Sequence, residues 1–116
     1  MSSAILEVLV GEEINAVSFV MDYVEFHFNG PILRSLTPPI LLTKKGRIQF
    51  PEAGSRDALC SLIGDTVEAA IIKSEKTIEL RLKSGRILSV PLDMGSRKGP
   101  EAAHFVPGIN QPLTVW

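Results

Sequence analysis

The sequence predicts an α+β domain built on a curved antiparallel sheet or a partly open β-barrel, with one or two helices. Three observations favour it: a helix pattern at residues 55–63, strand patterns within residues 66–92, and a likeness between residues 2–36 and 55–90. An all-β barrel with one helix is the alternative. A chain of 116 residues has the length of one domain, so we expect residues 1–116 to form a single domain.

The composition is that of a folded globular chain. Apolar residues make up 45% and charged residues 22% of the sequence, unlike disordered chains. The formal net charge of −1 gives no general attraction to nucleic acid or to an anionic membrane. Residues 1–33 nevertheless carry five acids and no Lys or Arg, which indicates either a solvated acidic face or one that meets a partner.

The single cysteine, Cys60, excludes an intramolecular disulfide and a zinc site built on several cysteines, and it fits a reducing compartment. The N-terminus lacks the basic and long apolar regions of a signal peptide, and no apolar stretch approaches the length of a membrane span. We therefore expect a cytoplasmic protein with no membrane segment and no cofactor.

The clearest helix pattern covers residues 55–63. Ser55 is placed to cap it, Asp57 suits the positive end of its dipole, and Gly64 stands where it would end. Its apolar stripe consists of Ala58, Leu59, Leu62 and Ile63.

Strand patterns follow at residues 66–73, 77–82 and 86–92. A three-residue turn between the last two, ending on a left-handed Gly85, makes their apolar faces coincide. It pairs Leu80 with Leu88 and Ile78 with Val90. The same reasoning predicts a second hairpin with a three-residue turn at residues 44–46, whose apolar pairs are Leu42 with Ile48 and Ile40 with Phe50.

Residues 2–36 can be aligned with residues 55–90. Gly11 falls on Gly64, V-E-F-H-F at residues 24–28 falls on I-E-L-R-L at residues 78–82, and Gly30 falls on Gly85, with one-residue slips in turns. The alternatives are a duplicated unit related by a pseudo-twofold axis and two ordinary hairpins that look alike.

The alignment favours a second helix at the N-terminus, capped by Ser2 or Ser3 and ended by Gly11. Its apolar residues are Ile5, Leu6, Leu9 and Val10. At the other end of the chain, the Gly, Ser and basic residues of segment 93–100 predict a mobile loop. Short strands are expected at residues 101–106 and 113–116, with Trp116 packed on the body.

Several segments together resemble a known family. They are a hairpin with a Gly turn, T-P-P-I-L-L, L-I-G-D-T-V, I-E-L-R-L-K-S-G-R-I-L-S-V-P, G-P-E-A-A-H-F and a V-W terminus. The order resembles a family of small, uncharacterised bacterial domains of unknown function, some of which look like immunity or accessory proteins. The resemblance covers nearly the whole chain from about Gly11 onward. It implies a bacterial cytosolic protein and carries over no catalytic residue.

Candidate ligand-binding residues surround the strand at residues 22–28. Alternation places its apolar side chains on one face and Tyr23, Glu25 and His27 on the other. A type I′ turn at residues 29–30 would bring Phe26 opposite Leu33 and Glu25 opposite Arg34. With the second histidine, the candidates are Tyr23, Glu25, His27, Arg34 and His104. The alternative is the solvent side of a half-buried sheet. The two histidines lack ligand spacing, so no metal site is expected.

These observations favour a non-enzymatic module that binds a protein partner or a small ligand. One alternative is a small enzyme that uses His27 or His104 with a carboxylate. Another is nucleic-acid binding through basic hairpin tips, formed by Lys44, Lys45, Arg47, Lys73, Lys76, Lys83 and Arg86. Aliphatic residues expected on outer faces, namely Ile32, Leu41 and Ile87, also predict a second layer that covers them. The alternatives for this layer are a second copy of the chain in a homodimer and the C-terminal segment that ends in Trp116.

Overall fold

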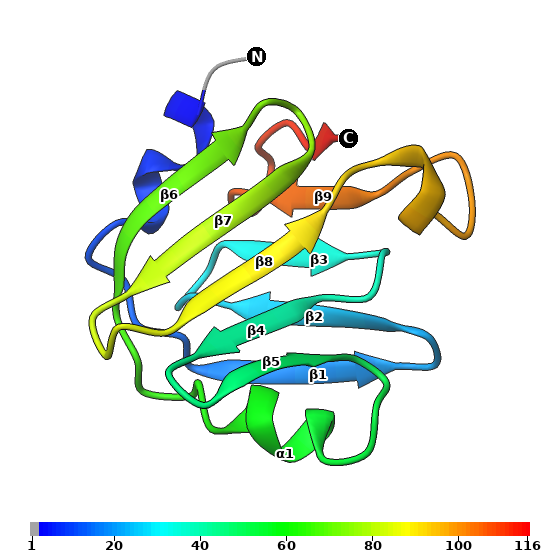
Figure 1. The fold of residues 1–116 in the computed structure, drawn as a ribbon. Coiled ribbons are helices and arrows are strands. Elements are labelled where there is room, and N and C mark those ends of the chain that lie inside the picture. The colour runs from blue at the N-terminus through cyan, green and yellow to red at the C-terminus, as the bar shows by residue number, and fades with distance from the viewer. Residues whose placement is uncertain (1–2) are drawn as a thin grey trace.

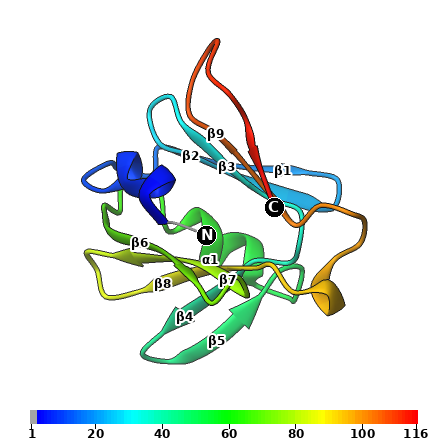
Figure 2. The same cartoon turned by 90° about the horizontal axis from the view of Figure 1, so that it is seen from above.

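A computed structural model describes residues 3–116 as two antiparallel sheets that face each other (Figures 1 and 2). The first sheet has the strand order β1-β2-β3-β9-β10. Its strands are β1 (Ala16–Val20), β2 (Tyr23–His27), β3 (Ile32–Ser35), β9 (Ala103–Val106) and β10 (Thr114–Val115). The second sheet has the order β5-β4-β8-β7-β6. Its strands are β4 (Ile40–Thr43), β5 (Gly46–Gln49), β6 (Val67–Lys73), β7 (Thr77–Leu82) and β8 (Ile87–Pro91).

Antiparallel sheet with few helices is what the sequence predicts, but the arrangement differs from a single curved sheet or a barrel. Each sheet ends on an edge strand at both sides, so within residues 3–116 neither closes on itself. In the described part of the chain, helical structure is limited to three short elements, η1 (Ser3–Leu9), α1 (Ser55–Cys60) and η2 (Met94–Ser96). No helix of the described residues is long and apolar enough to cross a membrane.

The core lies between the two sheets because each contributes alternate apolar side chains to the shared interior. On β2 and the residue after it, Val24, Phe26 and Phe28 are fully buried, as alternation predicts. Opposite them, Ile78 and Leu80 of β7 are fully buried as well. The outward residues of both sheets are therefore free to carry polar groups.

Two of the predicted hairpins are confirmed in register. In β7 and β8, Leu80 lies opposite Leu88 and Ile78 opposite Val90. The turn between them requires a left-handed residue, and Gly85 supplies it with φ of 94°. In β2 and β3, Phe26 lies opposite Leu33 and Glu25 opposite Arg34, as expected from the turn at residues 29–30.

The predicted register of the β4–β5 hairpin is wrong. Leu41 lies opposite Ile48 and Thr43 opposite Gly46, so the turn consists of two residues, Lys44 and Lys45. Leu41 is 1% exposed and points into the core, not outwards. The cause is the neighbouring strand: β4 also pairs with β8, where Leu41 lies opposite the inward-facing Leu88. A run of three apolar residues does not reveal its inner face by itself.

The helix at residues 55–63 is shorter than predicted. The α-helix ends at Cys60, and Gly54 is its N-cap. Ser55 is its buried first residue, and the Ser55 hydroxyl has no hydrogen-bond partner among residues 3–116. Leu62 is buried as expected, but Ile63 is 50% exposed. Because residues 61–64 form turns, the helical stripe does not extend to Ile63.

At the N-terminus the expected helix is a 3-10 helix, η1. Leu6 and Leu9 are fully buried, whereas Ile5 and Val10 are 41% and 39% exposed. A 3-10 helix has about 3 residues per turn, so residues three apart lie on one side and the wider α-helical stripe is lost. The proposed cap Ser2 lies outside the described residues.

A short antiparallel ladder joins the segment before β1 to the segment before β6. The amide of Gly11 donates to the carbonyl of Val67 (2.8 Å), and that of Gly64 donates to the carbonyl of Ile14 (2.7 Å). Ile14 also donates to Asp65 (2.9 Å), and Val67 to Glu12 (3.0 Å). These bonds connect the lead-in strands of the two sheets.

The C-terminal part is ordered by specific bonds. Trp116 is 9% exposed, as expected, and its backbone exchanges hydrogen bonds with Ala102 and Ala103. Segment 93–100 is not simply a loop, because Asp93 caps η2 by accepting from the amide of Ser96. The Arg97 guanidinium then donates to the carbonyls of residues 92 and 100.

Candidate functional site

The outer face of the first sheet carries a row of polar side chains. Glu25 of β2 lies opposite Ser18 of β1 on one side and opposite Arg34 of β3 on the other. Arg34 in turn lies opposite His104 of β9. Directly opposite residues of a sheet share a face and lie within contact distance, so the registers place these four side chains in one line.

Hydrogen bonds connect the row. Arg34 Nε donates to Glu25 Oε2 at 2.7 Å, and Arg34 Nη1 lies 2.9 Å from His104 Nδ1. On the far side, His104 Nε2 lies 2.8 Å from Glu101 Oε1. The side chains of Glu25 and His104 are each only 15% exposed, which weakens the competition from water.

These contacts define the tautomer of His104. A guanidinium has no acceptor, so Nδ1 of His104 must accept the bond from Arg34. The ring proton then resides on Nε2, which donates to Glu101. Both ring nitrogens of His104 are therefore engaged, Nδ1 as an acceptor and Nε2 as a donor.

His27 and Tyr23 flank the row. His27 Nε2 lies 3.4 Å from Glu25 Oε1 and 3.4 Å from Ser18 Oγ, at the long end of hydrogen-bonding distance. The guanidinium carbon of Arg34 lies 5.9 Å from the centre of the Tyr23 ring, within the range of a cation–π contact.

The structure thus places all the residues expected from the sequence on one face, where contacts through Glu25 and Arg34 connect them: Tyr23, Glu25, His27, Arg34 and His104. Two further residues that contact them, Ser18 and Glu101, are not among the ligand-binding candidates named from the sequence. Glu101 precedes His104 by three residues, a spacing that puts side chains on opposite faces of a regular strand. β9 begins only at Ala103, so Glu101 belongs to the preceding segment and can turn back to His104.

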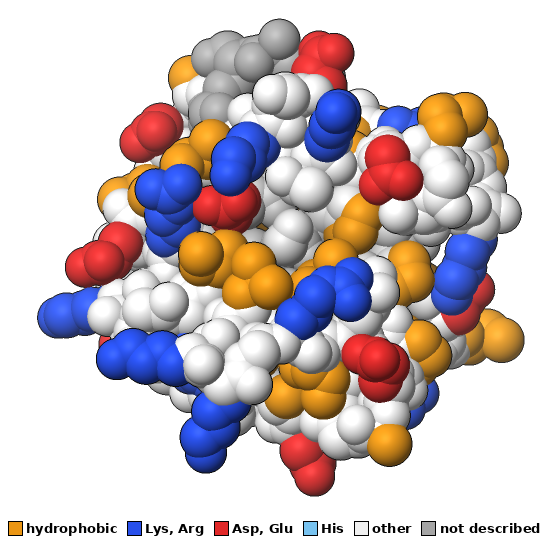
Figure 3. Space-filling model, viewed as in Figure 1, with side chains coloured by type: hydrophobic (Ala, Val, Ile, Leu, Met, Phe, Trp, Pro, Cys, Tyr) orange, Lys and Arg blue, Asp and Glu red, His pale blue; other side chains and the backbone are white. Residues whose placement is uncertain are grey.

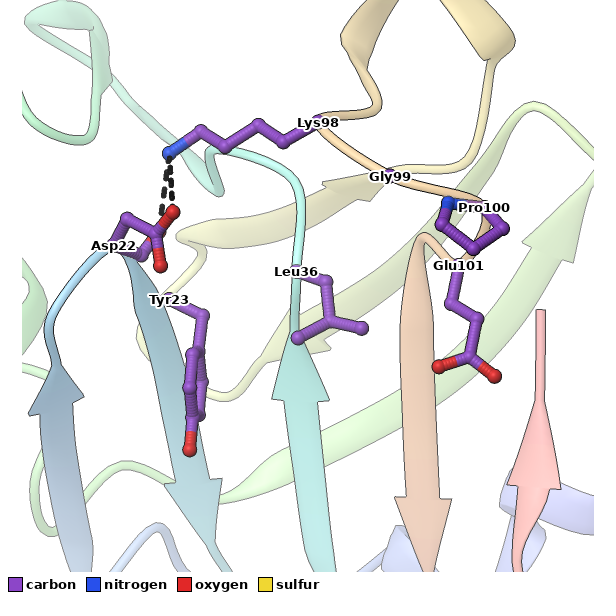
Figure 4. Close-up of a pocket in the computed structure, with 7 residues that line it drawn as sticks. All are labelled: Asp22, Tyr23, Leu36, Lys98, Gly99, Pro100 and Glu101. Carbon is purple, nitrogen blue, oxygen red and sulfur yellow. Dashed lines mark hydrogen bonds and ion pairs between the residues drawn. The ribbon is translucent and has the colours of Figure 1, made fainter.

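A cavity of about 270 Å³ adjoins the row. Figure 4 shows Tyr23 and Glu101 pointing the same way on either side of Leu36, which forms an apolar floor. Lys98 reaches across the rim to Asp22, with Nζ 3.2 Å from the Asp22 carbonyl and 3.7 Å from its carboxylate. The volume lies just below the usual range of ligand sites, about 300–1,000 Å³.

Two further observations bear on the chemistry of the molecule. Among residues 3–116 no group of three or more His, Cys, Asp or Glu side chains is placed to hold a metal ion. Cys60 is exposed on α1, away from the polar row.

Comparison with protein-family models, with curated proteins and with solved structures found no match for this chain. The resemblance to small bacterial domains therefore stays a prediction from the sequence.

Proposed function

We propose that this chain is a non-enzymatic binding module that holds a small ligand between Tyr23 and Glu101 on the outer face of the first sheet. The observation that carries the proposal is the connected polar row, which reaches the cavity wall at Glu101. Polar groups that are already oriented by one another lose little conformational entropy when a ligand binds.

The charges of the cavity favour a ligand with an amino group. Its lining includes the carboxylates of Asp22 and Glu101 and one cation, Lys98, which is paired with Asp22. One oxygen of Glu101 accepts from His104, and the other has no hydrogen-bond partner among residues 3–116. A small primary amine would donate to that oxygen while its carbon atoms contact Leu36 and the Tyr23 ring.

An NMR titration tests the proposal with ethanolamine, putrescine and acetate as probes. We expect the amines to shift the signals of Tyr23 and Glu101, acetate to leave them unchanged, and Glu101→Gln to weaken amine binding by about tenfold. Glu68→Gln, an exposed position on β6, is the matched control. Equal responses to amines and acetate, or equal losses in both variants, would count against an amine site.

The two hydrogen bonds of His104 disfavour a role for this residue as a general base. A base needs a nitrogen free to take a proton from substrate, and both nitrogens of His104 are engaged by Arg34 and Glu101. His27, with its longer contacts, is the only remaining histidine for the enzymatic alternative. An activity that survives the combined His27→Gln and His104→Gln changes would remove that alternative.

We also propose that residues 2–36 and 55–90 derive from a duplicated unit. The register Val17, Phe26, Leu33 across β1, β2 and β3 corresponds to Ala70, Leu80, Leu88 across β6, β7 and β8. The ladder between residues 11–14 and 64–67 supports the same alignment, in which Gly11 corresponds to Gly64 and Ile14 to Val67. The bond from Gly11 to Val67 then has its counterpart in the bond from Gly64 to Ile14. A crystal structure in which residues 11–36 and 64–90 failed to superpose would contradict the duplication.

A further inference from the structure

A second cavity, of about 630 Å³, lies between two hairpin turns and α1. The β4–β5 turn contributes Thr43, Lys44 and Lys45, the β7–β8 turn contributes Ser84 and Arg86, and the end of α1 contributes Ser61. Figure 3 shows Lys and Arg side chains gathered at the lower left of the molecule, where Figure 1 places these two turns. Residues far apart in the sequence thus form one basic hollow.

Arg86 is held in place on the wall of this hollow. Its Nη1 donates to Ser61 Oγ at 2.7 Å, and its Nη2 donates to Asp65 Oδ2 at 3.1 Å. Its Nε donates to Ser84 Oγ at 3.2 Å. These bonds tie the end of α1 to the β7–β8 turn, so the two sides of the hollow keep a fixed separation.

The charge of Arg86 is matched by Asp65. Burial acts to raise the pKa of Asp65, but hydrogen bonds from Ser84, Arg86 and Thr66 outweigh it and hold the pKa below its usual value. Asp65 is therefore ionised at neutral pH and neutralises Arg86.

Lys44 and Lys45 have no such partner. Both are exposed, and neither forms an ion pair or side-chain hydrogen bond with any residue in the described part of the chain. Two adjacent ammonium groups repel each other, and an anion bound between them would relieve that repulsion. The hydroxyls of Thr43, Ser61 and Ser84 add polar groups to the same hollow.

We propose that this hollow binds a small, hydroxyl-rich phosphorylated compound, with its phosphate on Lys44 and Lys45. Phosphate oxygens accept several charge-assisted bonds at once, which suits paired ammonium groups and hydroxyl donors. No aromatic ring lines the hollow among the described residues, so a nucleobase finds no surface for stacking. The volume lies within the usual range for ligand sites, about 300–1,000 Å³.

Calorimetric titration with glucose-6-phosphate, glucose, inorganic sulfate and a single-stranded RNA oligomer tests the proposal. We expect glucose-6-phosphate to bind more tightly than sulfate and glucose not to bind. The combined Lys44→Gln and Lys45→Gln change should weaken binding by at least about tenfold. Both substitutions lie on an exposed turn, and an unchanged circular dichroism spectrum would verify the fold.

The matched control is the combined Lys73→Gln and Lys76→Gln change, which removes the same charge from the β6–β7 hairpin. It should leave binding unchanged. Equal losses in the two pairs, or equal affinities for sulfate and glucose-6-phosphate, would overturn the proposal in favour of general charge attraction. If the RNA bound more tightly than glucose-6-phosphate, and this binding were lost on changing Lys44 and Lys45, the proposal would be overturned in favour of a nucleic-acid surface. Absence of glucose-6-phosphate binding at millimolar concentrations would overturn it outright.

Discussion

Replacing Asp65 by Asn removes one charge and leaves the size of the side chain almost unchanged. In the structure, Asp65 Oδ1 accepts from the amides of Thr66 and Ser84, at 3.0 and 3.3 Å. Oδ2 accepts from the Ser84 hydroxyl at 2.5 Å and from Arg86 Nη2 at 3.1 Å. An Asn has only one acceptor oxygen, so two of these donors would face its NH₂ group.

The expected loss is dominated by the bond to Arg86, because the Ser84 hydroxyl can rotate and accept from the new NH₂. A hydrogen bond to a charged group contributes about 1.5–3 kcal/mol, so we expect the free energy of unfolding to fall by about 2–3 kcal/mol. At about 2.1 cal/mol/K per residue, a chain of 116 residues has an unfolding entropy of about 0.24 kcal/mol/K. The midpoint of thermal unfolding should therefore fall by about 10 °C.

The same change should alter the response to acid. The pKa of Asp65 is lowered in the folded state, so its contribution to stability is fully present above the unfolded pKa of about 3.9 and is lost as the pH falls through the folded value. The stability difference between the unsubstituted protein and Asp65→Asn should therefore be constant near neutral pH and shrink below about pH 4.

Thermal and urea unfolding, followed by the emission of the buried Trp116, measure both effects. Asp57→Asn is the control, since Asp57 is exposed in the first turn of α1 and should change the free energy of unfolding by no more than about 0.5 kcal/mol. If Asp65→Asn shifted the midpoint by less than about 2 °C, or if the difference from the unsubstituted protein persisted at low pH, the assigned role of the carboxylate would be wrong.

Three further predictions follow from the packing and the polar row. Leu41→Ala should lower the free energy of unfolding by about 2–5 kcal/mol, and Leu42→Ala should lower it by less than about 1 kcal/mol, as measured by chemical denaturation. The reverse order would show that β4 has a different register. Nitrogen NMR of His104 should show the ring proton on Nε2, and Arg34→Gln should remove the shift of the Nδ1 signal that the bond from Arg34 produces. A proton on Nδ1 would contradict the network. The homodimer expected from the sequence would use, on the second sheet, the partly exposed Ile87, Ile40 and Leu42. It predicts a mass above 12.6 kDa in light scattering, and a constant 12.6 kDa over a tenfold concentration range would exclude it.

The hairpins show when sequence alone determines a register. In β7, apolar residues alternate cleanly with polar ones, and only a three-residue turn into β8 makes Leu80 face Leu88. In β4, Ile40, Leu41 and Leu42 are all apolar, so the local pattern fits either face. Pairing with β8 selects the face of Leu41, and that contact joins residues far apart in the sequence.

Five residues of the candidate site were predictable from the sequence, but Ser18, Glu101 and the contacts between strands were not. Alternation along β2 and the turn before β3 place Tyr23, Glu25 and Arg34 on one face. That His104 joins them depends on β9 pairing with β3 across a long stretch of chain, which no local pattern encodes. The basic hollow has the same origin, because its two turns meet only after the second sheet has assembled.

The ladder between residues 11–14 and 64–67 limits how the two sheets can move. Each of its strands leads directly into one sheet, at β1 and at β6, so a relative sliding of the layers would break several backbone hydrogen bonds at once. Asp65 lies in this ladder through its carbonyl and reaches Arg86 through its carboxylate. The wall of the basic hollow is therefore anchored, through Asp65, to the same backbone ladder that joins the two sheets.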